Sequence, residues 1–197
     1  MYEVLPSFIL GFHGCDRDVS EEVFAGRATL RQSENNYDWL GHGIYFWENN
    51  PQRALEYARL LQSRSHARSR VVHPCVIGAV IDLGYCMNLL DSQFLDMVKN
   101  GYASLDAALK LAGQPLPQNR ATGRSNELLI RDLNCAVIEM VHQIRYDRED
   151  KSFDSVRGVF VEGEELYPGA GFRARNHIQV CVRNPQCIKG YFRVIED

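Results

Sequence analysis

The chain has 197 residues, of which 45% are hydrophobic and 24% are charged, a composition typical of a globular domain and not of a disordered chain. The length predicts a single domain over residues 1–197. The formal net charge of −3 excludes a global positive field that would hold nucleic acid or anionic lipid, so any such contact must be a local patch.

Cysteine usage and hydropathy indicate the compartment. The six cysteines show neither a C-x-x-C pair nor zinc-site spacing, so we expect neither a disulfide framework nor a metal. The first residues carry no basic region before their short apolar stretch, unlike a signal peptide. No window approaches the roughly 18 consecutive apolar residues of a membrane span. We therefore expect a cytoplasmic protein that does not contact a membrane.

The first half of the chain alternates predicted strands and helices. The apolar run 8–14 predicts a buried strand that ends at a glycine. Residues 20–24 begin with a serine N-cap and predict a short helix. The aromatic and β-branched run 44–47 predicts a strand, and a proline opens an amphipathic helix over 51–66. The near-continuous apolar run 76–83 predicts a strand that is covered on both faces.

The second half opens with helical patterns at 92–100 and 105–111, followed by a loop over 113–123 that is rich in proline, glycine and glutamine. Apolar spacing over 127–145 predicts the longest helix, of about five turns. Strands thus enclose a helical insertion over about 85–150, an order that predicts a mixed α+β domain. The last strands are expected at 156–161, 178–182 and 191–194.

The first block suited to ligand binding is Phe12-His13-Gly14-Cys15, at the end of a predicted strand. A glycine there lets backbone groups approach a planar ligand, and the histidine can hydrogen-bond a sugar hydroxyl. A His-Gly pair is also common in ordinary turns, so both interpretations stay open.

The second block is the segment 41–46, with the sequence GHGIYF, followed by Tyr57 in the next predicted helix. Two tyrosines presented by a strand and the following helix, Tyr45 and Tyr57, are suited to hold a flat aromatic ring between them. The alternative is that both tyrosines belong to the core.

The third block is the late strand 178–182 together with the residue before it. Strand alternation points His177, Gln179 and Cys181 to one face. Polar side chains on one face of an otherwise apolar strand indicate a function.

Taken in this order, the three blocks resemble the ADP-ribosyltransferase superfamily, in the branch of diphtheria toxin and the poly(ADP-ribose) polymerases. That branch has a His-Gly-Ser/Thr block, a Gly-x-Gly-x-Tyr-Phe strand followed by a helix with a second tyrosine, and a late strand that bears a glutamate. The resemblance covers residues 8–83 and 156–194. It implies split antiparallel sheets, here with an inserted helical segment, and NAD as a co-substrate.

The resemblance also implies a role for each matching residue. His13 would bond a ribose hydroxyl of NAD and Gly14 would hold the nicotinamide amide. Tyr45 and Tyr57 would stack on the nicotinamide ring. Ala54 stands where the family has a serine that bonds the amide, so that contact is missing or supplied differently.

The position of the catalytic glutamate departs from the family. In the family, this glutamate binds the 2′-hydroxyl of the nicotinamide ribose and stabilises an oxocarbenium-like transition state, whereas this strand offers Gln179 and His177. A glutamine accepts the same hydrogen bond but brings no negative charge. We expect Gln179 to act in catalysis with Tyr45, with His177 as the alternative. Cys15, at the family's hydroxyl position, and Phe46 complete the expected NAD site.

Two loops offer further contacts. Glu162, Glu164 and Glu165 precede the late strand and either supply a carboxylate or form a solvated acidic turn. Tyr167 and Phe172 flank a glycine-rich loop that either meets the acceptor or packs locally. A basic segment after the second block either contacts a nucleic-acid backbone or forms a solvated face. Its residues are Arg53, Arg59, Arg64, His66, Arg68 and Arg70.

The function implied by the resemblance is a mono-ADP-ribosyltransferase that releases nicotinamide and transfers ADP-ribose to a macromolecular acceptor: protein, RNA or DNA. A free-standing domain of this kind is similar to bacterial toxins of toxin–antitoxin or phage-defence systems, which implies an antitoxin protein as a partner. Two alternatives stay open. Water as the acceptor would make the chain an NAD glycohydrolase, and loss of catalysis would leave a module that binds NAD or ADP-ribose.

Overall fold

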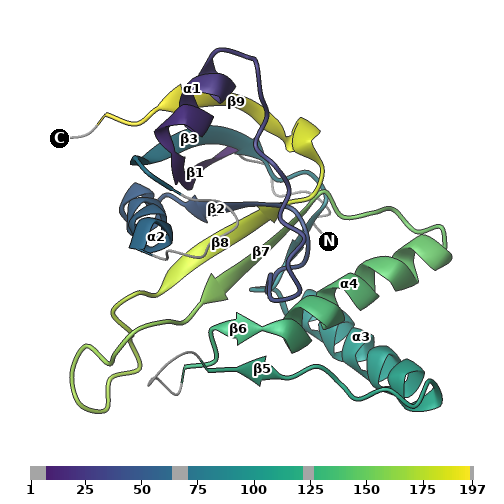
Figure 1. Cartoon of the computed structure of the whole chain (residues 1–197). Coiled ribbons are helices and arrows are strands. Elements are labelled where there is room, and N and C mark those ends of the chain that lie inside the picture. The colour runs from purple at the N-terminus through teal and green to yellow at the C-terminus, as the bar shows by residue number, and fades with distance from the viewer. Residues whose placement is uncertain (1–7, 64–70, 122–126, 196–197) are drawn as a thin grey trace.

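The structure is a computed structural model that describes residues 8–63, 71–121 and 127–195. It has the predicted α+β class (Figure 1). The helices are α1 (Arg17–Phe24), α2 (Pro51–Ser63), α3 (Ser92–Leu111) and α4 (Asp132–Asp147). The strands are β1 (Phe8–Asp16), β2 (Ile44–Glu48), β3 (Pro74–Asp82), β4 (Cys86–Asn88), β5 (Asn119–Arg120), β6 (Ile130–Arg131), β7 (Ser155–Phe160), β8 (His177–Val182) and β9 (Ile188–Arg193), with a short 3-10 turn over Pro185–Cys187.

Seven of these strands form one mixed sheet in the order β4-β7-β8-β2-β1-β3-β9, and within it β4 and β7 run parallel. The other two, β5 and β6, pair separately. β1 pairs with β3 along its whole length but with β2 at Gly11 and Phe12 alone. The expected pair of split sheets is therefore corrected to a single sheet that narrows at the β1–β2 junction, because this short ladder still joins the two halves.

The helical insertion needs two corrections. The patterns at 92–100 and 105–111 belong to one continuous helix, α3, in which Gly101 lies between them. A Cβ at Gly101 would lie 2.5 Å from Val141 of α4, so the glycine allows the two helices to pack closely. At 20 residues α3 is longer than α4, which has 16, because residues 130–131 pair with β5 before α4 begins. Among the described helices, none is both long and apolar enough to cross a membrane.

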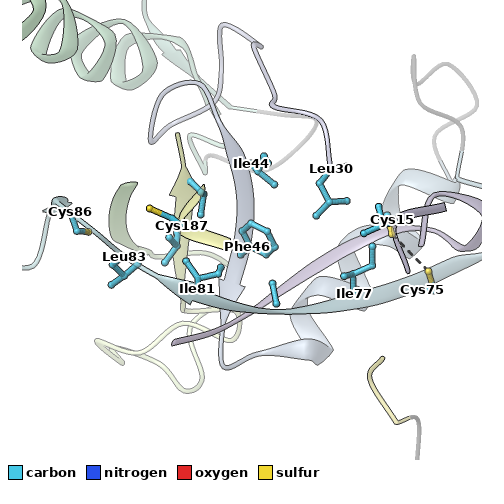
Figure 2. Close-up of a cluster of buried hydrophobic side chains, with 14 residues drawn as sticks. Cys15, Leu30, Ile44, Phe46, Cys75, Ile77, Ile81, Leu83, Cys86 and Cys187 are labelled. Atoms are coloured by element: carbon cyan, nitrogen blue, oxygen red, sulfur yellow. Dashed lines mark hydrogen bonds between the residues drawn. The ribbon is translucent and has the colours of Figure 1, made fainter. Parts of the chain in front are cut away.

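Buried apolar side chains form separate clusters around the sheet. The first core cluster includes Phe46 of β2 and the facing pair Cys15 and Cys75, whose Sγ atoms lie 3.8 Å apart (Figure 2). The second cluster joins the insertion to the sheet through residues such as Leu40 and Val141. In Figure 1 the helices α3 and α4 lie side by side below the sheet, whereas α1 and α2 lie at its other end.

Candidate functional site

The two faces of the β2–β8 pair differ in character. The strands run antiparallel with Tyr45 opposite Cys181 and Trp47 opposite Gln179, so alternate residues share a face. One face is apolar and belongs to the first core cluster through Ile44, Phe46, Val180 and Val182. The other, here termed the polar face, carries Tyr45, Trp47, His177, Gln179 and Cys181. The three residues predicted to be catalytic, Tyr45, His177 and Gln179, therefore share one face of the β2–β8 pair.

His177 begins β8 and lies buried at the end of the polar face, with 7% of its surface exposed. Its ring stacks on Phe160 at a centroid distance of 5.4 Å and lies 6.1 Å from the ring of Trp47. Its Nδ1 lies 2.7 Å from the carbonyl oxygen of Arg175. Because a carbonyl only accepts, Nδ1 carries the proton. Burial lowers the pKa of His177 to about 4, so the imidazole is neutral at pH 7.

Gln179 lies two residues further along β8, and its side chain is already engaged. Its Oε1 accepts a hydrogen bond of 2.6 Å from the indole Nε1–H of Trp39. The Trp39 ring packs on Phe160 and fits there because Gly158 leaves room for it. The amide oxygen that was expected to accept from a ribose hydroxyl is thus held by an indole. Of the two side chains, His177 therefore keeps a ring nitrogen without a partner, whereas the Gln179 amide oxygen has one.

The two tyrosines expected to hold a flat ring are in different surroundings. Tyr45 is largely buried, and its hydroxyl donates to the carbonyl of Gly41 and accepts from the N–H of Leu40. Burial raises the pKa of Tyr45 well above its usual value. Tyr57 is 38% exposed on α2, and its ring centroid lies 5.0 Å from that of Trp47. A flat ring held between two others needs about 7 Å between their centroids. Tyr57 and Trp47 therefore leave no room for a third ring between them.

Trp47 was missed by the sequence analysis, although a signal for it existed. It lies two residues after Tyr45 on the same strand and therefore shares its face. Its ring lies between those of Tyr57 and His177 and is 4% exposed. Trp47 is thus the aromatic side chain that joins the predicted stacking residue to the predicted catalytic strand.

The block around His13 lies at the β1–β2 junction. The imidazole of His13 packs 5.8 Å from Phe46, and its Nδ1–H donates to the carbonyl of Tyr45 at 2.8 Å. Burial lowers the pKa of His13. On the other side of β1, Gly14 lies against α2, where any side chain would collide with the carbonyl of Ala54. Ala54 is fully buried with Trp47. His13 therefore joins β1 to β2, and Gly14 allows α2 to pack closely on β1. The contacts of these residues to NAD stay a prediction.

Cys15 and Phe46 do not reach the polar face. Both side chains belong to the first core cluster, where Cys15 contacts Cys75 and Phe46 is fully buried (Figure 2). The physical reason is strand alternation, which turns Phe46 away from the face that Tyr45 occupies. Both side chains thus lie in the core, and their predicted contacts to NAD stay a prediction.

A group of charged residues from distant segments lies beside His177, and we call it the arginine cluster: Arg53, Arg131, Arg175 and Glu162. The carboxylate of Glu162 lies 3.0 Å from a guanidinium nitrogen of Arg53 and 3.3 Å from a guanidinium nitrogen of Arg175. The guanidinium of Arg131 lies 4.6 Å from the centroid of Phe160, the ring on which His177 stacks. The sequence analysis noted Glu162 in an acidic loop and Arg53 in a basic segment, but not together. The four residues lie too far apart in the sequence to form a local pattern.

The other loop residues lie at the surface. Glu165 pairs with Arg173, and Glu164 is exposed, so Glu162 is the least exposed carboxylate of this acidic group and is held by two arginines. Tyr167 and Phe172 are exposed. Arg59 lines a groove between α1, α2 and β9. The remaining predicted basic residues, Arg64, His66, Arg68 and Arg70, lie outside the described residues.

Buried polar atoms without hydrogen-bond partners gather at this site. Such an atom costs about 1–3 kcal/mol, and native proteins contain few of them. In the described part of the chain, four of the five belong to the polar face and the arginine cluster: Trp47 Nε1, Arg53 Nε, Arg131 Nε and His177 Nε2. The fifth is Nε2 of His142 on α4. These four side chains therefore make the polar face and the arginine cluster the candidate site.

The helical insertion holds the loop from which Tyr45 emerges. Glu139 of α4 accepts from the N–H of His42 at 2.7 Å and from Arg183 at 2.6 Å. Arg183 also donates to the carbonyl of His42 at 3.0 Å. Burial opposes ionisation of Glu139, but these bonds keep its pKa below the usual value. The insertion therefore fixes the segment to which the Tyr45 hydroxyl is bonded.

Comparison with known proteins leaves the function to be argued from this site. The chain is 26% identical to an uncharacterised protein, MJ0359, of Methanocaldococcus jannaschii, over an alignment that covers 90% of this chain and 83% of the relative. No family model and no solved structure matches.

Proposed function

We propose that the chain binds NAD at the polar face and transfers its ADP-ribose to an acceptor, with release of nicotinamide. The observation that carries the proposal is His177: a buried, neutral imidazole with an unpaired Nε2, at the start of the strand where the resembling family has its catalytic glutamate. Tyr45 and Trp47 share its face, and α2 brings Tyr57 to the Trp47 ring.

His177 is suited to the glutamate's positioning role but not to its charge. The bond from Nδ1–H to the Arg175 carbonyl fixes the ring, and Nε2 is then an acceptor for a ribose hydroxyl. The glycosidic C–N bond breaks, nicotinamide leaves with the electron pair, and the acceptor's nucleophile bonds to C1′ and gives up its proton. A neutral imidazole stabilises the developing cation less than a carboxylate does. Turnover therefore depends mainly on holding the ribose in place.

Stacking of nicotinamide on Tyr57 requires the ring of Tyr57 to move. Its centroid lies 5.0 Å from that of Trp47, too close to admit a third ring. Tyr57 is the more exposed of the two, and Trp47 is fixed against Ala54 and Phe12. In this proposal nicotinamide enters between Tyr57 and Trp47 as the Tyr57 side chain turns outward.

A specific observation also favours a second candidate, a module that binds NAD or ADP-ribose without turnover. The buried carboxylate nearest the site, that of Glu162, is paired with Arg53 and Arg175. The amide oxygen of Gln179 is held by Trp39. Neither is free to stabilise a cation, so binding without cleavage is the direct rival of the transferase.

The test is incubation of the purified chain with NAD labelled on the adenylate, with and without lysate separated into protein, RNA and DNA fractions. We expect label fixed in one fraction and a matching release of nicotinamide. Release without fixed label would indicate a glycohydrolase, and NAD binding without release would indicate the binding module.

A matched pair of variants identifies the catalytic strand in the same assay. His177→Ala should abolish most release. His142→Ala should not, although His142 is also a buried histidine with an unpaired Nε2 and a pKa lowered by burial to about 4. Equal effects of the two substitutions would contradict the assignment of His177.

A further inference from the structure

Three arginines from three separate segments converge beside His177. Arg53 comes from α2, Arg131 from β6 and Arg175 from the loop before β8. Arg53 and Arg175 meet at the carboxylate of Glu162, and Arg53 also pairs with Glu56. The carbonyl of Arg175 holds His177, so the cluster and the proposed ribose contact share one residue.

The cluster carries more positive charge than its carboxylates neutralise. Three guanidinium groups stand against the carboxylates of Glu162 and Glu56, and the neighbouring His177 is neutral. Arg131 forms no ion pair within the described ranges and stacks on Phe160 instead. A half-buried guanidinium is seldom left without a counter-charge, because its desolvation is costly. Arg131 therefore shares the carboxylate charge of Glu162 with Arg53 and Arg175, without an ion-pair contact of its own in the described ranges.

The unpaired atoms of this region are mostly hydrogen-bond donors. The Nε–H groups of Arg53 and Arg131 and the indole Nε1–H of Trp47 are buried and have no acceptor. Guanidinium and indole N–H groups donate and do not accept. A ligand that pairs with all three donors would supply several acceptor oxygens, and its negative charge would suit the two guanidinium groups. A phosphate group has both, and guanidinium groups bind it in a well-matched geometry.

We propose that Arg53, Arg131 and Arg175 form a phosphate-binding subsite next to the ribose position of His177. The phosphate belongs either to the diphosphate of the NAD molecule or to a phosphate on the acceptor, which attacks from beside the same ribose. The assignment of either source rests on the proposed function, whereas the binding of phosphate by the arginines does not.

The test is calorimetric titration of the full chain with pyrophosphate, inorganic phosphate and ADP-ribose, for four proteins. These are the wild type, Arg131→Gln, Arg175→Gln and Arg120→Gln. Arg120 is a matched control, since it lies on β5, paired with β6, and forms an exposed ion pair with Asp132. We expect Arg131→Gln to weaken pyrophosphate and ADP-ribose binding by about tenfold or more, and Arg120→Gln to leave both unchanged. Arg175→Gln, a change on a half-exposed side chain, should weaken binding in the same direction.

The order of addition distinguishes the two sources. If ADP-ribose prevents pyrophosphate from binding, the subsite holds the diphosphate of NAD. If inorganic phosphate binds to the protein already saturated with ADP-ribose, and Arg131→Gln removes that binding, the subsite holds an acceptor phosphate. Either result supports the subsite.

Two results would overturn the subsite: no heat of binding with any of the three probes, or the same change in affinity for Arg131→Gln and Arg120→Gln. Failure of the transferase has a different signature. In that case NAD releases no nicotinamide, while pyrophosphate still binds and still depends on Arg131.

Discussion

The apolar and polar faces of the β2–β8 pair are built from the same two strands and have opposite properties. On the apolar face, Phe46 and Val180 are fully buried among other apolar side chains. On the polar face, Trp47 and His177 are almost as buried, yet each has a ring nitrogen without a partner. Burial alone therefore does not separate core from site. The state of the buried polar atoms does, because folding alone gives no reason to keep them unpaired.

Among single substitutions, Phe46→Ala should have the largest effect on the free energy of unfolding. The ring is fully buried in the first core cluster, and its loss leaves a cavity between β2 and its neighbours. Removal of a buried phenylalanine costs about 3–5 kcal/mol. Urea unfolding followed by far-UV circular dichroism measures the change. A loss below 1 kcal/mol would show that this face is not the main support of the fold.

Acid should destabilise the protein through two buried histidines. Burial lowers the pKa of His177 and His142 from 6.5 to about 4, so between these values the unfolded chain binds protons that the folded chain does not. The contribution of these histidines to the free energy of unfolding is fully present above pH 6.5 and is lost as the pH drops towards 4. Each histidine contributes on the order of 3 kcal/mol.

The change is measured by urea unfolding at pH 7.0 and pH 4.5, for the wild type and for the double variant His142→Asn, His177→Asn. The double variant should lose less stability between the two pH values, because two of the buried histidines no longer take up protons on unfolding. An equal loss in both proteins would place these imidazoles in contact with water.

Nicotinamide release should distinguish two neighbours on the polar face. His177→Ala should lower the rate by about 100-fold, the usual effect of removing one positioned transition-state contact. Gln179→Ala should keep the rate within about threefold, because its amide oxygen is held by Trp39. Single-turnover assays with saturating NAD measure both. The reverse order of effects would return the catalytic role to Gln179.

Glu139→Gln should have the smallest effect of the four. It removes the charge that holds Arg183 and weakens the bond to the His42 N–H, so the loop before β2 loosens. We expect a loss of about 1 kcal/mol in the free energy of unfolding, because the pair is partly exposed. We also expect nicotinamide release to fall by a few fold. A change in stability without any change in release would show that the insertion does not position Tyr45.

The sequence predicted the elements of the sheet better than it predicted the site. Alternation and apolar runs located β1, β2, β3, β7, β8 and β9, because a strand can be identified from the pattern of neighbouring residues. They placed His177 and Gln179 on one face of β8, and the strand register of the structure added Tyr45 to that face. The same pattern did not show that α3 continues through Gly101, since that depends on contact with Val141 of another helix.

What could not be predicted depends on contacts between distant segments. Gln179 was preferred to His177 because nothing near it in the chain shows that Trp39 occupies its amide oxygen. Arg131 lies in a helical insertion that the resemblance does not cover, and only the fold brings its guanidinium to Phe160. Trp47 was identifiable from its alternation with Tyr45. The closed contact between Trp47 and Tyr57 requires the helix packing that Ala54 and Gly14 allow.

Tryptophan fluorescence tests the location of the NAD site most directly, because both tryptophans of the chain adjoin the polar face. The Trp39→Phe variant leaves Trp47 as the single emitter, next to Tyr57 and His177. Titration of this variant with NAD should give a saturable change in emission, with the same midpoint as NAD binding measured by calorimetry. Calorimetric binding of NAD without any change in Trp47 emission would contradict a site at the polar face.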